Sequence, residues 1–99
     1  MFGISDHFVD QCIDHFDENE QLDILEEECA ELIKACSKFK RAQGHYTIVD
    51  PLDNLIEELA HVAISSAVIA KLYGIKQEDI EAEVNKKAAK YNFTKVKEA

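Results

Sequence analysis

The feature that most constrains this fold is a helical pattern that occurs twice, thirty residues apart. Residues 25–32 read LEEECAEL and residues 55–62 read LIEELAHV. At 3.6 residues per turn, positions i and i+3 share one face of a helix. The pattern therefore pairs Glu28 with Glu31 on one predicted helix and Glu58 with His61 on the next. Each pair lies beside a stripe of leucines that is expected to face a partner helix.

The repeated acidic pairs predict a cation site between the two helices. Carboxylates at the edge of a core are costly to desolvate unless they are paired or bind metal. Ala30 and Ala60 separate the acidic positions in the two copies, and small residues let helices approach closely. Either copy alone is better explained as a solvated, charged helix face. The duplication favours a carboxylate pocket for a hard divalent cation such as Mg²⁺, which binds carboxylates together with substrate phosphates.

Hydrophobic spacing predicts an all-α chain that resembles a four-helix bundle, with no sheet. Ser5, Asn19 and Asp50 are the predicted N-caps, and Gly74 is the predicted C-cap. Residues 42–50 are predicted to form a loop. The predicted helices cover residues 6–16, 20–41, 51–73 and 77–91.

Length and charge restrict the classes of function. Ninety-nine residues form one domain, residues 1–99, and the net charge of −9 argues against binding a nucleic acid polymer. No stretch has the apolar length of a membrane span, and the N-terminus lacks the features of a signal peptide. We expect a cytoplasmic protein in which Cys29 and Cys36 pack as small buried hydrophobes.

The third predicted helix indicates an oligomer. From Leu59 onward it is apolar nearly all round, and three neighbouring helices of this size hide too little of that surface. We therefore expect a homodimer or a homotetramer.

The two motifs resemble those of the all-α nucleoside triphosphate pyrophosphohydrolases, the superfamily of MazG-like proteins. Glu27-Glu28-Cys29-Ala30-Glu31 is similar to its EExxE motif, and Glu58-Leu59-Ala60-His61 stands where its ExxD motif belongs. The similarity covers roughly residues 20–75. It implies a helical oligomer that hydrolyses a nucleoside triphosphate to the monophosphate and pyrophosphate with Mg²⁺. The metal ligands that it implies are Glu28, Glu31, Glu58 and the residue at position 61. In the hydrolase hypothesis that follows, Glu27 or Glu31 is the candidate general base.

Position 61 departs from the family pattern, because this chain has histidine where the family has aspartate. Histidine is a poor ligand for Mg²⁺ and a good one for Mn²⁺, iron, nickel or zinc. Three alternatives follow: three glutamates hold the metal with reduced activity, the imidazole selects a softer metal, or the chain binds nucleotide or a partner without catalysis.

Basic residues are the candidate ligands for substrate phosphates. Lys38 follows Glu31 by seven residues and so shares its face. The family has a lysine and an asparagine near the end of the fourth helix, to which Lys87, Lys90 and Asn92 correspond loosely. Glu58-x-x-His61 also has the spacing used by carboxylate-bridged di-iron and di-manganese bundles. The competing functions are therefore such a di-metal protein and a non-catalytic helical interaction module.

Overall fold

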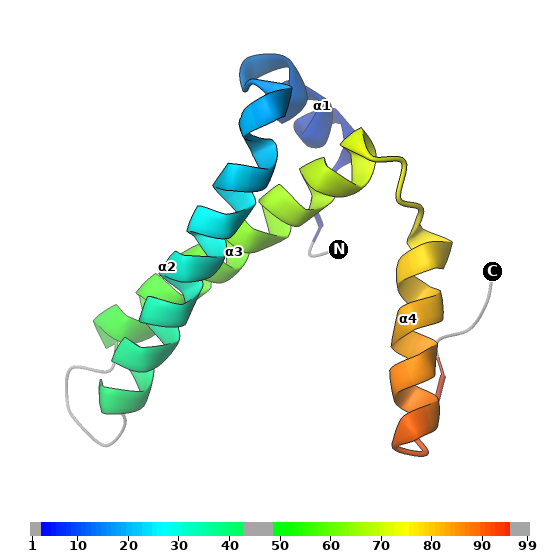
Figure 1. Ribbon diagram of the computed structural model, residues 1–99. Helices are drawn as coiled ribbons and strands as arrows, with labels where there is room; N and C mark the ends of the chain where they lie inside the picture. The colour runs from blue at the N-terminus through cyan, green and yellow to red at the C-terminus, as the bar shows by residue number, and fades with distance from the viewer. Residues whose placement is uncertain (1–2, 43–48, 96–99) are drawn as a thin grey trace.

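The computed structural model describes residues 3–42 and 49–95, and in that part of the chain the regular elements are helices, with no strand. This confirms the all-α prediction. The order of elements along the chain is α1 (Asp6–His15), the 3₁₀ helix η1 (Glu18–Glu20), α2 (Gln21–Ala42), α3 (Val49–Leu72) and α4 (Gln77–Lys90) (Figure 1).

The start of α1 follows the sequence prediction. The backbone N–H of Phe8 donates a hydrogen bond of 3.1 Å to Ser5 Oγ, which makes Ser5 the N-cap. The prediction of Asn19 as the cap of the next helix is wrong. Asp17 accepts a hydrogen bond from the Asn19 N–H and begins η1, a short turn that leads directly into α2.

Two long helices, α2 and α3, form an antiparallel hairpin that is the largest packed unit of the chain (Figure 1). Helix α3 begins at Val49, so that Asp50 lies in its first turn and not before it, as the sequence prediction had it. Residues 43–48 of the predicted loop lie outside the described residues. Helix α1 packs across the C-terminal half of α3, where Lys71 Nζ contacts Asp10 Oδ1 at 2.7 Å.

Gly74 ends α3 as predicted. Its φ of +65° is a left-handed conformation that favours glycine, and the Ile75 N–H donates to the Ala70 carbonyl at 2.8 Å. The chain then turns into α4, which lies apart from the α2–α3 hairpin (Figure 1). A single chain therefore does not close the four-helix bundle that the sequence suggested.

The core of the single chain is small. The largest side chain that is almost fully buried is Val68, which is 1% exposed. The buried hydrophobic residues in the described ranges are Val9, Ala35, Ala63, Val68 and Ala88. Cys29 and Cys36 are exposed in the single chain, which corrects the expectation that both are buried.

No helix of the described residues is both long enough and apolar enough to cross a membrane.

Candidate metal centre

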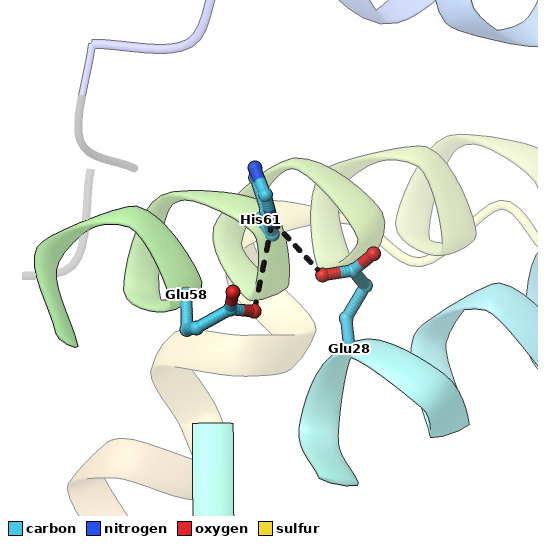
Figure 2. Close-up of side chains that lie close together, drawn as sticks. All are labelled: Glu28, Glu58 and His61. Carbon is cyan, nitrogen blue, oxygen red and sulfur yellow. Dashed lines mark ion pairs between the residues drawn. The ribbon is translucent and has the colours of Figure 1, made fainter. Parts of the chain in front are cut away.

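Three predicted ligands converge where α2 packs against α3. Glu28 projects from α2 toward α3, and Glu58 and His61 come from successive turns of α3 (Figure 2). His61 Nδ1 lies 3.1 Å from Glu28 Oε2 and 3.6 Å from Glu58 Oε2. One ligand atom from each residue fits within 4.8 Å of the other two. The antiparallel packing thus joins residues that are thirty and more positions apart in the sequence.

The inner carboxylate oxygens of Glu28 and Glu58 face no hydrogen-bond donor among the described residues. Glu58 is only 9% exposed, and the Glu28 side chain is 27% exposed. Glu28 Oε2 and Glu58 Oε2 are buried, and neither accepts a hydrogen bond from the described residues. His61 Nδ1 is within ion-pair distance of both oxygens but forms a hydrogen bond with neither.

This arrangement favours a positive charge between the two carboxylates. Two carboxylates that approach each other inside a protein repel, and a buried oxygen without a donor costs free energy. A cation placed between them offsets both costs, and the only side chain with a basic atom in the cluster is His61. Two carboxylate oxygens and one imidazole nitrogen therefore form a donor set that fits a divalent transition metal.

Glu31 and Glu27 are not part of the cluster. The Glu31 side chain is 53% exposed and contacts Lys34 Nζ at 3.3 Å, one turn further along α2. Glu27 is exposed on α2 and lines a cleft that also contains Glu28 and His61. Of the four predicted metal ligands, the structure brings together Glu28, Glu58 and His61 and leaves Glu31 outside.

The predicted phosphate ligands lie away from the cluster within one chain. Lys38 is exposed on α2, ten residues or about 15 Å along the helix from Glu28. Lys87, Lys90 and Asn92 belong to α4 and the turn that follows it, which stand apart from the α2–α3 hairpin (Figure 1). Asn92 has a φ of +58°, and its role in the structure is to end α4.

A cleft of about 340 Å³ adjoins the cluster, and sequence reasoning missed most of its lining. Two buried polar residues, Gln21 and Ser65, lie in it, 4% and 6% exposed. Their spacing was a usable signal, because Gln21 precedes Glu28 by seven residues and Ser65 follows Glu58 by seven. The apolar part of the lining comes from Cys12, Phe16, Ile24, Ile64 and Val68.

Comparisons of the chain with protein-family models, with curated proteins and with solved structures find no significant match. The functional interpretation therefore depends on the residues of this chain and on their geometry.

Proposed function

We propose that this chain is a divalent-metal-dependent nucleoside triphosphate pyrophosphohydrolase of the MazG-like type. The observation that carries the proposal is the pair of buried carboxylate oxygens, on Glu28 and Glu58, that have no donor and that meet beside His61. A cation between the two carboxylates offsets their mutual repulsion, and a metal held by few protein ligands keeps positions free for phosphate oxygens.

The donor set favours Mn²⁺ over Mg²⁺. Imidazole nitrogen is a better ligand for Mn²⁺, iron or zinc than for Mg²⁺, which prefers an all-oxygen shell. His61 Nδ1 is the ring nitrogen that faces both carboxylates. A bound divalent ion screens the phosphate charge and lowers the pKa of a coordinated water. Glu28, Glu58 and His61 are the residues that hold it.

The cleft beside the cluster supports a role in binding an organic ligand. Its wall includes Phe16, Ile24 and Ile64, which exclude water from one side, and the polar Gln21. Glu27 lies in the same cleft and is exposed, so it is the carboxylate available to accept a proton from an attacking water. In this proposal the triphosphate of the substrate faces the cluster, and its nucleobase lies along the apolar wall.

The test is release of pyrophosphate from a panel of ribonucleoside and deoxyribonucleoside triphosphates, with Mg²⁺ or Mn²⁺. We expect turnover with Mn²⁺ and at least a tenfold loss in Glu28→Gln, because this change removes one ligand charge. Glu26→Gln is the matched control, since Glu26 is exposed two residues away on the same helix. Absence of turnover with either ion, in a protein that binds Mn²⁺ by calorimetry, refutes the catalytic proposal and favours a non-catalytic metal-binding module.

A second candidate is a carboxylate-bridged di-metal protein. The residues that converge are one glutamate from α2 and the Glu58-x-x-His61 pair from α3, which together are half of the ligand set of such bundles. Two copies would supply the whole set. Iron content near one ion per chain and visible absorption after aerobic purification would favour this candidate, and purified protein that contains neither iron nor manganese would exclude it.

A further inference from the structure

Two buried polar side chains in the wall of the cleft are not part of the cluster of Glu28, Glu58 and His61. Gln21, the first residue of α2, is 4% exposed, and Ser65 in α3 is 6% exposed. Buried polar groups are normally hydrogen-bonded. The Ser65 hydroxyl forms no hydrogen bond with the described residues, and the Gln21 side chain forms one. The cleft therefore offers hydrogen-bonding groups that the chain itself leaves free.

The η1 turn fixes which end of the Gln21 carboxamide is free. Gln21 Nε2 donates a hydrogen bond of 3.4 Å to the carbonyl oxygen of Asp17, the residue that caps η1. A carbonyl oxygen only accepts, so the amide atom that faces it is the nitrogen, and this determines the orientation of the amide. Gln21 Oε1 is left without a donor among the described residues. A ligand in the cleft therefore meets a fixed hydrogen-bond acceptor.

Both polar residues lie on the same side of the cluster. Gln21 precedes Glu28 by seven residues in α2, and Ser65 follows Glu58 by seven in α3. Seven residues are two turns, about 10 Å along a helix, and return to nearly the same face. Because α2 and α3 are antiparallel, both steps lead away from the cluster in the same direction (Figure 1). A ligand with its anionic group at the cluster thus reaches the polar pair with its other end.

The lining around the polar pair suits a flat aromatic ring. Phe16, which is 48% exposed, lines the cleft together with Ile64 and Val68. Aromatic side chains stack on any nucleobase, because every base has a π-face. Such stacking holds a base with little preference among bases, so selection must come from the polar atoms.

We infer that Gln21 selects nucleotides whose base is adenine or cytosine, because these bases carry an exocyclic amino group. The inference rests on the proposed function, in which the cleft holds the base of a nucleoside triphosphate. The amino group donates a hydrogen bond to Gln21 Oε1, whereas the carbonyl oxygen of hypoxanthine or uracil at the same position meets it acceptor to acceptor. Two acceptors that are removed from water without a donor cost free energy, which disfavours the carbonyl-bearing base.

Ser65 contributes affinity without this selection. The ring nitrogen next to the exocyclic group is an acceptor in adenine and cytosine, and a donor in hypoxanthine and uracil. A serine hydroxyl rotates and either donates or accepts, so Ser65 forms a hydrogen bond with both kinds of base. The Gln21 amide does not adapt in this way, because the Asp17 carbonyl holds its nitrogen. The two residues therefore have different effects in a binding experiment.

Two matched pairs of nucleotides test the inference by calorimetry in the presence of Mn²⁺. The pairs are cytidine with uridine and adenosine with inosine, each as a triphosphate with a methylene group between the α and β phosphorus atoms, which prevents hydrolysis. We expect the amino-bearing member of each pair to bind the wild-type protein at least about tenfold more tightly, because the carbonyl-bearing member leaves a buried acceptor unpaired. Release of pyrophosphate from ordinary triphosphates is measured separately, so that a failure of catalysis is recognised on its own.

Two variants assign the preference to a residue. Gln21→Met keeps the length of the side chain and removes the acceptor, and we expect the members of each pair to bind it within about twofold of each other. Ser65→Ala should weaken both members and keep their ratio. Gln11→Met is the matched control, because Gln11 is exposed on α1 and does not line the cleft; it should keep the wild-type ratio. Circular dichroism and the Kd of Mn²⁺ verify the fold and the cluster in each variant.

Three results would overturn the inference. Equal or reversed binding within the pairs by the wild-type protein shows that no fixed acceptor contacts the base, and it leaves the proposed function intact if pyrophosphate is released. A preference that persists in folded Gln21→Met assigns the selection to another residue. Absence of binding by all four analogues, together with absence of turnover, refutes the proposed function and the inference with it.

Discussion

Replacing Glu58 by glutamine should change stability in opposite directions with and without metal. The ligand atoms of Glu28 and Glu58 lie within 4.8 Å of each other, and at an effective dielectric constant of about 20 two unit charges at that distance repel by about 3 kcal/mol. Glutamine keeps the shape, removes one charge and adds an amide donor on the side of Glu28. We therefore expect the free energy of unfolding of the metal-free variant to rise by about 1–3 kcal/mol.

With metal the sign reverses. A saturating ion at a hundredfold excess over its Kd adds about 2.7 kcal/mol to the wild-type protein. The Glu58→Gln variant loses one anionic ligand and should lose most of that gain. The stability order of the two proteins is then inverted between EDTA and Mn²⁺.

Thermal unfolding followed by circular dichroism measures both effects at one protein concentration. For a domain of this length about 1 kcal/mol corresponds to roughly 4–8 °C in Tm, so the metal-free difference is readily resolved. Glu57→Gln is the control, because it removes the same charge from the neighbouring exposed position and should shift stability by less than about 0.5 kcal/mol. A Glu58→Gln protein that is less stable than the wild type in EDTA, or that keeps the full response to Mn²⁺, would refute the reasoning.

Three further predictions follow from particular contacts. His61→Asp converts the donor set to oxygen alone, so the ion that raises Tm most should change from Mn²⁺ to Mg²⁺; an unchanged order of ions would show that the imidazole is not a ligand. Ser5→Ala removes the acceptor of the Phe8 N–H and should lower the free energy of unfolding by about 1 kcal/mol in urea titrations, whereas Ser5→Thr should retain most of it. The hydrogen bond with Asp10 raises the pKa of Lys71 above its ordinary value of 10.5. The contribution of this hydrogen bond to the free energy of unfolding is therefore present below the pKa of Lys71 in the unfolded chain and is lost as the pH rises through its raised pKa in the folded chain. Lys71→Met should remove this loss at alkaline pH from urea midpoints measured against pH.

Helix boundaries were predictable where local chemistry decides them. The Ser5 cap and the Gly74 terminator are set by hydrogen bonds within a few residues, and both were found as expected. The start of α2 was not, because Asp17 competes with Asn19 for the capping position and Asp17 takes it, which begins η1 ahead of α2. Such competition depends on small differences in geometry that a residue pattern does not contain.

The cluster of Glu28, Glu58 and His61 was predictable in part for a similar reason. The i, i+3 spacing alone places Glu58 and His61 together, but the same spacing also paired Glu28 with Glu31. The structure separates that second pair, because Glu28 points into the α2–α3 contact while Glu31 is rotated outward toward Lys34. A rotation of one helix relative to its neighbour decides this, and it follows from the packing of both helices together.

The sequence by itself determined that the chain is helical, where most of its helices begin and end, and which turns carry acidic residues, since these depend on contacts within about one turn. The tertiary structure decided which acids meet, that α4 stands away from the hairpin, and that several large apolar residues of α2 and α3 are left exposed. These outcomes depend on the relative rotation and separation of helices, which arise only when faces distant in the sequence compete for the same buried surface.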